Sequence, residues 1–305
     1  MGNLRTICGC AIRNEGTFRL EAVKLATSIF VSISFFLGAI FLQSHLFAQN
    51  ASSGHRSAGL KASVPLVGCP SDGQEGLLEA PPPRGESMDV AVSPEIAQRL
   101  AYYKAYDGPG ILAPRGWHCF GTSGSYGSNL YVTPEPIRWN ALSSIDWKGF
   151  TGAAIQISEM SRGTSGRFEV ARIIALVFPA HLAFAEGVIS EGIVPASSFR
   201  KGPYLSDKLK YFSKDALEYE TPANREGLGT NSRLKKNSSP IKGVAIFNPD
   251  MEDPSLIYAA LRLPSNATEL EPIIIREIEC AASKELNLSF GNIRKKQQQG
   301  CVLLN

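Results

Sequence analysis

The chain has 305 residues, of which 44% are hydrophobic and 19% are charged, so it can build a sizeable apolar core. Its formal net charge is only +3, which creates no strong field for a polyanion. The short basic clusters at 235–236 and 294–296 contain no interleaved aromatic residues, which excludes the usual pattern of nucleic-acid binding. We therefore expect no nucleic-acid partner.

The first feature along the chain is an uncharged apolar run at residues 25–42 (LATSIFVSISFFLGAIFL). Its length lies between that of a signal-peptide core and that of a membrane-spanning helix. Basic residues outnumber acidic ones in the preceding segment 1–24, which predicts that this segment stays cytoplasmic and that later residues are translocated. The run then either anchors the chain in the inner membrane, facing the periplasm, or is removed by cleavage near Ala48 or Ala51 to give a secreted periplasmic protein.

The next segment, 43–63, is polar and rich in small residues, which is typical of a flexible linker. Residues 64–290 are expected to form a single exported domain, because that length suffices for one hydrophobic core. The last segment, 291–305, is predicted to be a flexible tail.

The first helix of the domain is predicted at residues 94–107. Ser93 can cap its N-terminus, and proline suits its first position, which Pro94 occupies. Three apolar residues recur at helical spacing, namely Ile96, Leu100 and Tyr103. A Gly-Pro pair at 108–109 is expected to end the helix.

Two longer helices are predicted at 166–191 and 268–286. The first of them contains Pro179, which should kink it or split it in two because proline removes a backbone donor. The second begins with the pattern of a capping box, formed by Thr268 and Glu271.

Strands are predicted between these helices, at 64–68, 129–133, 152–158, 216–220, 242–247 and 256–263. The last one alternates in period two, so Ile257, Ala259, Leu261 and Leu263 share one face. The connection after residue 247 is too short for a crossover helix and predicts an antiparallel hairpin. Together the elements predict an α+β domain, in which three helices cover a mostly antiparallel sheet of about five strands behind the N-terminal signal or anchor helix.

The densest chemical pattern of the domain is the segment 110–128 (GILAPRGWHCFGTSGSYGS). Its Gly and Ser residues predict a flexible loop on an exposed edge. We expect Arg115, Trp117 and Tyr126 to contact a ligand or partner, since aromatic and Arg side chains supply area and directional bonds at interfaces. The alternative is that Trp117 and Phe120 fill the core.

Cys119 lies in the same segment and leaves two interpretations open. As a free thiol it could be a catalytic nucleophile, with His118 or His181 as the base. His118 is poorly placed for that role, because neighbouring residues of a strand point to opposite faces. His181 falls on an apolar helix face, where a histidine is usually a satisfied core residue.

The second interpretation of Cys119 is a disulfide with Cys69, because an exported domain meets an oxidising compartment. Both cysteines lie in Gly- and Pro-rich segments on either side of the first predicted helix. The sequence leaves open whether Cys280 and Cys301 are paired.

Several chemical classes have no pattern in this chain. The histidines are scattered, and no CxxC pair follows the apolar run, so we expect no metal site. The Gly/Ser stretch after Phe120 contains neither a phosphate-binding loop nor the Gly-x-Ser-x-Gly turn of hydrolases. No cofactor is expected.

Three stretches, at 67–74 (VGCPSDGQ), 99–125 and 165–184, resemble a set of uncharacterised exported bacterial proteins. The resemblance covers most of the chain after the linker. It implies export, and it carries no known activity, cofactor or site.

The sequence thus predicts an exported or membrane-anchored envelope protein that binds a ligand or partner without catalysing a reaction. Its expected contacts are the membrane, through residues 25–42 if they are retained, and an envelope ligand or protein. The alternative is a thiol-dependent hydrolase or transferase that uses Cys119. The state of that sulfur distinguishes the two, because a disulfide removes the nucleophile.

Overall fold

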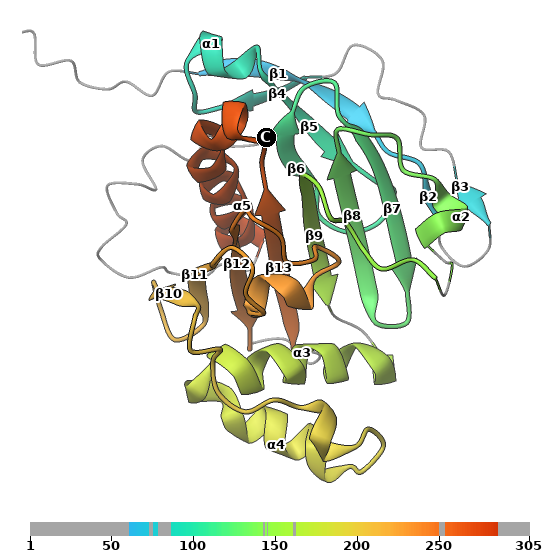
Figure 1. Ribbon diagram of the computed structural model, residues 1–305, viewed down its shortest axis with the longest axis vertical. Coiled ribbons are helices and arrows are strands. Elements are labelled where there is room, and N and C mark those ends of the chain that lie inside the picture. Colours follow the sequence, from blue (N-terminus) through green and yellow to red (C-terminus); the bar gives the residue numbers. More distant parts are fainter. Residues whose placement is uncertain are drawn as a thin grey trace, which may run out of the picture. The chain divides into compact units, whose positions relative to one another are not determined.

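The computed structural model describes residues 61–72, 76–78, 87–142, 144, 146–160, 163–249 and 254–285. These residues form an α+β fold with two sheets (Figure 1). The apolar run at 25–42, the cleavage positions near Ala48 and Ala51 and the tail at 291–305 lie outside the described residues. Within the described residues, no helix combines the length and the hydropathy that a bilayer crossing needs.

The larger sheet contains nine strands in the order β10-β11-β12-β13-β9-β8-β7-β2-β3. They are β2 (Ser71–Asp72), β3 (Leu77–Leu78), β7 (His118–Gly124), β8 (Gly127–Thr133), β9 (Ala154–Met160), β10 (Lys208–Tyr211), β11 (Ala216–Thr221), β12 (Ile241–Asn248) and β13 (Ser255–Arg262). Neighbouring strands are antiparallel except β2 and β7, which are parallel. β12 and β13 form the hairpin that the short connection predicts.

The smaller sheet contains four strands in the order β4-β1-β5-β6. They are β1 (Ala62–Gly68), β4 (Ser87–Val90), β5 (Leu100–Lys104) and β6 (Ile111–Pro114). β1 and β5 run parallel. The prediction of a single sheet of about five strands is therefore wrong both in the number of strands and in the number of sheets. Many of the additional strands are too short to show a local pattern.

The described residues form five α-helices. Their bounds are α1 (Pro94–Ala97), α2 (Trp139–Leu142), α3 (Gly163–Val177), α4 (Leu182–Ser190) and α5 (Glu271–Glu285). α3 and α4 are separated by one 3-10 turn at Pro179–His181, which confirms the predicted break at Pro179. α5 begins at Glu271, after a 3-10 turn at Ser265–Leu270, so the capping box expected at Thr268 does not start it.

The helix predicted at 94–107 is wrong beyond its first turn. The Ser93 hydroxyl caps α1 as expected by accepting a hydrogen bond from the Ile96 amide. α1 then ends at Ala97, and the chain continues as β5 between β1 and β6. Leu100 and Tyr103 are fully buried there. Pairing with two strands distant in sequence overrides the local helical spacing in this segment.

Two clusters of buried residues lie on the opposite faces of the larger sheet. One joins α5 and the smaller sheet to residues of β8, β9, β12 and β13. The other joins α3 and α4 to β11, β12 and β13 (Figure 1). Ile257, Ala259 and Leu261 share the first cluster, as their alternation predicts, but their neighbours on β13 are also buried. On the side of the larger sheet that α3 and α4 cover, the parts of β8 and β9 beyond the second cluster carry polar side chains.

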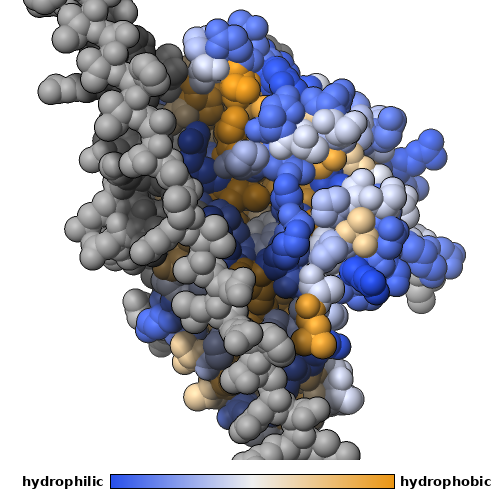
Figure 2. Space-filling model, turned by 60° about the vertical axis from the view of Figure 1, so that its left-hand side comes forward, coloured by the Kyte–Doolittle hydropathy of each residue, from blue (hydrophilic) through white to orange (hydrophobic). Residues whose placement is uncertain are grey.

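Apolar residues are also visible on the molecular surface, where Figure 2 shows orange patches between hydrophilic ones. Seven large apolar or aromatic side chains are exposed among the described residues, namely Leu77, Tyr106, Tyr126, Leu182, Ile193, Leu205 and Tyr211. Exposed apolar residues of this kind are common on soluble domains. Of the seven, Tyr126 alone lines a polar cavity beside β8 and β9.

Gly127 begins β8 directly after Tyr126 and offers a test of the sheet geometry. Its φ is +125°, and a Cβ atom there would lie 2.0 Å from the Glu159 carbonyl oxygen of β9. We expect Gly127→Ala to lower the free energy of unfolding by about 2 kcal/mol, because the backbone is strained and the strand must shift. Urea denaturation measures this change.

Gly187 in α4 supplies the matched control. It is exposed, and an added Cβ would meet no atom within 4 Å. Gly187→Ala should therefore raise the free energy of unfolding by about 0.5–1 kcal/mol through helix propensity. Equal effects of the two substitutions would contradict the close approach of β8 to β9.

Candidate functional site

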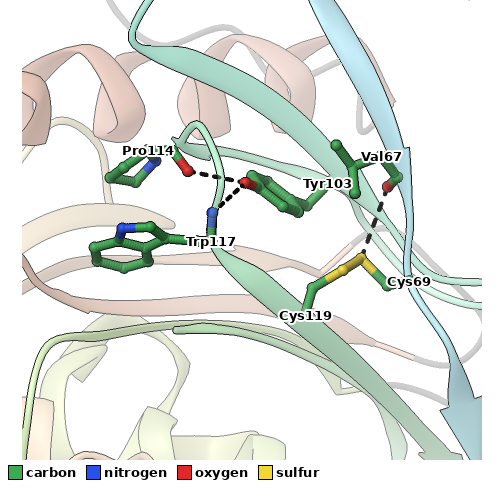
Figure 3. Close-up of a disulfide and its surroundings, with 6 residues drawn as sticks. All are labelled: Val67, Cys69, Tyr103, Pro114, Trp117 and Cys119. Atoms are coloured by element: carbon green, nitrogen blue, oxygen red, sulfur yellow. Dashed lines mark hydrogen bonds between the residues drawn. A yellow bond between two sulfur atoms is a disulfide. The ribbon is translucent and has the colours of Figure 1, made fainter. Parts of the chain in front are cut away.

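Cys69 and Cys119 form the predicted disulfide (Figure 3). Their sulfur atoms lie 2.02 Å apart, and their Cα atoms are separated by 5.3 Å. Cys69 directly follows β1 of the smaller sheet, whereas Cys119 lies in β7 of the larger one. The disulfide therefore links the two sheets. Cys280, which is buried in α5, is disulfide-bonded as well.

The disulfide determines the state of Cys119. Its sulfur is bonded to Cys69, so it has no thiolate to attack a substrate while the bond is intact. His118, its neighbour on β7, is exposed. The bond also indicates that the chain folds in an oxidising, extracytoplasmic compartment.

His181 lies at the junction of the turn at Pro179–His181 with α4, where its Nε2 atom is 2.5 Å from Asp215 Oδ1. Both side chains are 13% exposed. The imidazole also contacts the edge of the Phe247 ring, which belongs to the cluster under α3 and α4. Cys119 packs against the cluster on the opposite face of the sheet. The structure therefore does not bring Cys119 and His181 together.

Arg115 and Trp117 form contacts within the protein at the turn between β6 and β7. The Arg115 guanidinium donates to the carbonyl oxygens of Leu100 and Ala97, at 3.1 and 2.9 Å. The Trp117 amide donates to the Tyr103 hydroxyl at 3.0 Å, and its indole packs against the core (Figure 3). The segment at 110–128, expected as a loop, consists mainly of β6, β7 and the start of β8.

Tyr126 lines a polar cavity of about 490 Å³ on the sheet face that α3 and α4 do not cover completely. This volume falls in the usual range of small-molecule sites. The cavity is lined by Tyr126, Ser128, Asn129, Tyr131, Gln156, Glu159, Met160, Glu169, Thr230, Asn231, Ser232, Arg233 and Lys235. Tyr126 lies in the turn between β7 and β8, and the other residues come from β8, β9, α3 and the segment that follows β11.

Asn129 and Gln156 line the cavity floor, and the fully buried Ser158, which lies outside the lining, is hydrogen-bonded to both. The Gln156 side-chain amide donates to Ser158 Oγ at 2.9 Å and to Asn129 Oδ1 at 3.3 Å. Ser158 Oγ in turn donates to Asn129 Oδ1 at 2.7 Å. Gln156 and Ser158 are buried, yet each has partners. Such a satisfied network holds the floor in one arrangement.

Arg233 forms the rim above that floor. Its backbone amide donates to Gln156 Oε1 at 2.7 Å, and its carbonyl accepts from the Phe150 amide at 2.8 Å. The guanidinium carbon lies 5.6 Å from the centre of the Trp147 ring, within the range of a cation–π contact. Burial raises the pKa of the Tyr131 hydroxyl, and the positive charge of nearby Arg233 partly opposes this shift.

Most of this site was not predictable from the sequence. In β9 the apolar residues Ile155 and Ile157 alternate with Gln156 and Ser158, a pattern that assigns the polar pair to a solvated face. The pair is instead covered by the segment around Arg233, which is distant in sequence. The available signal was the amide side chain of Gln156 between two isoleucines of a predicted strand.

The cavity offers hydroxyl, amide, carboxylate and guanidinium groups, together with two tyrosine rings. It can therefore hold a small polar molecule by several directional bonds. Among the residues that the structure describes, no group of His, Cys, Asp and Glu side chains is arranged to bind a metal ion. No protein-family model, curated protein or solved structure matches the chain.

Proposed function

We propose that this protein is an exported, non-catalytic binding domain that takes a small polar ligand into the cavity beside Tyr126. Residues 25–42 direct it across the inner membrane, where it remains anchored or is released into the periplasm. The Cys69–Cys119 disulfide and the resemblance to exported bacterial proteins support this location.

The observation that carries the proposal is the ordered polar floor of the cavity. Asn129 and Gln156 line the floor, and their hydrogen bonds to each other and to the fully buried Ser158 fix them before a ligand arrives. Preorganised polar groups bind a ligand at a lower entropic cost than mobile ones do. Tyr126, which is 45% exposed at the cavity, adds an aromatic surface against which a ligand can pack.

The proposal is tested by a thermal-unfolding screen of the full-length protein with sugars, amino acids, organic acids and nucleosides. A ligand present at about 100 times its dissociation constant should stabilise the protein by about 2.7 kcal/mol. Tyr126→Ala should reduce this stabilisation, because the variant removes contact area in the cavity.

Tyr106→Ala is the control, since Tyr106 is 74% exposed and lies outside the cavity lining. It should leave the stabilisation unchanged. The proposal fails if no compound shifts the unfolding temperature, or if the Tyr126 variant responds as fully as the wild-type protein does.

A further inference from the structure

We propose that the ligand carries a carboxylate, which binds to the Arg233 guanidinium and the Tyr131 hydroxyl at one end of the cavity. This inference rests on the proposed function, and it specifies the chemical class of the ligand. The guanidinium presents parallel N–H groups whose spacing matches the two oxygens of a carboxylate.

The first support is the fixed position of Arg233. Its backbone is bonded on one side to the Gln156 side chain of β9 and on the other to the Phe150 amide. The ring of Trp147 lies against the guanidinium. A donor held in this way loses less conformational freedom on binding than a free surface arginine does.

The second support is the charge of this end of the cavity. In the extended segment from Ser232 to Lys235, Ser232 and Leu234 are buried, whereas Arg233 and Lys235 are exposed and line the cavity. Residues two apart in an extended chain share a face. In the part of the chain that the structure describes, neither Arg233 nor Lys235 forms an ion pair.

The acidic residues of the lining do not remove this positive charge. Glu169 is bound to Arg172 in an ion pair along α3. Glu159 belongs to β9, where it is paired with Ser128, whereas Gln156, next to Arg233, is paired with Tyr131. Three residues of strand separate the two positions by about 10 Å. The cavity is thus cationic at the Arg233 end.

The third support is Tyr131, a residue that is 4% exposed and whose hydroxyl lies near the Arg233 guanidinium. A neutral tyrosine donates a hydrogen bond, so it can bind one carboxylate oxygen while the guanidinium binds both. A ligand with a neutral amide in the place of the carboxylate would direct an N–H group toward a hydrogen-bond donor of the protein, where no bond can form. The site should therefore prefer an acid to its amide.

Calorimetric titration of the full-length protein with two matched pairs tests the inference. The pairs are succinate with succinamide, and benzoate with benzamide; glucose, trehalose and inorganic phosphate are titrated separately. We expect at least one carboxylate to bind at least ten times more tightly than its amide, because a charge-assisted bond contributes about this factor.

Arg233→Gln should weaken carboxylate binding by about ten- to a hundredfold, and Arg233→Lys should restore part of it. Arg225→Gln is the control, since Arg225 is exposed in the same connection but outside the cavity lining. The unfolding free energy of the Arg233 variants should stay unchanged, which separates loss of binding from loss of folding.

The inference is overturned if sugars bind and no carboxylate does, a result that leaves the proposed function intact. It is also overturned if acid and amide bind equally or if phosphate is preferred to every carboxylate. If none of the probes binds and the thermal screen is also negative, the inference and the proposed function fail together.

Discussion

Replacing Cys69 and Cys119 together by alanine should lower the free energy of unfolding by about 4 kcal/mol. The two residues are 50 positions apart, and closing a loop of that length removes this much entropy from the unfolded chain in the chain-entropy model. Alanine is the appropriate replacement, because the fully buried site of Cys69 would leave a serine hydroxyl without water.

Guanidinium chloride denaturation of the wild-type protein and the double variant measures the difference. Tyr106→Ala, a change at an exposed site, should stay within about 0.5 kcal/mol of the wild-type protein. Equal midpoints for the wild-type and the double variant would show that the disulfide does not constrain the unfolded chain.

Arg262→Met should cost about 4 kcal/mol, because Arg262 is 2% exposed and donates to three backbone carbonyls. The acceptors are the carbonyl oxygens of Gly152, Phe150 and Lys235, at distances between 2.6 and 3.0 Å. Methionine fills a similar volume but leaves these oxygens buried without a donor.

The same substitution should also impair ligand binding. Arg262 joins the segment around Phe150 to Lys235, and these two segments hold Arg233 in its place at the cavity. Arg262→Lys should have an intermediate effect, since a single ammonium cannot reach all three oxygens. Denaturation and calorimetry on the same samples measure both effects.

Arg225→Met is the matched control, because Arg225 is exposed. It should leave both the unfolding free energy and the binding unchanged. A stable Arg262→Met protein would show that the three carbonyls find other donors, and that Arg262 does not hold these segments.

The elements with strong local patterns were predictable. Pro179 predicted the break between α3 and α4, and the short connection after Phe247 predicted the β12–β13 hairpin. The Cys69–Cys119 disulfide followed from compartment and position. For Pro179 and the hairpin, a local backbone property decides the outcome, and the sequence records such properties directly.

The elements that depend on distant partners were not predictable. Leu100 and Tyr103 have helical spacing, and their place in β5 follows from pairing with β1 and β6. Most of the cavity depends in the same way on Arg233 reaching Gln156, which lies 77 residues earlier. Tyr126 was the one cavity residue expected as a ligand contact, because aromatic side chains supply area at interfaces.

The pairing of β9 with β13 has a consequence for how the chain acquires its fold during synthesis. Ile155 of β9 is paired with Leu261 of β13, so roughly a hundred residues must follow β9 before its partner strand exists. Until then the hairpin of β7 and β8, together with β9, has an open edge that can pair with another nascent chain. High contact order of this kind slows folding. A chaperone that shields this edge should therefore raise the yield of native protein.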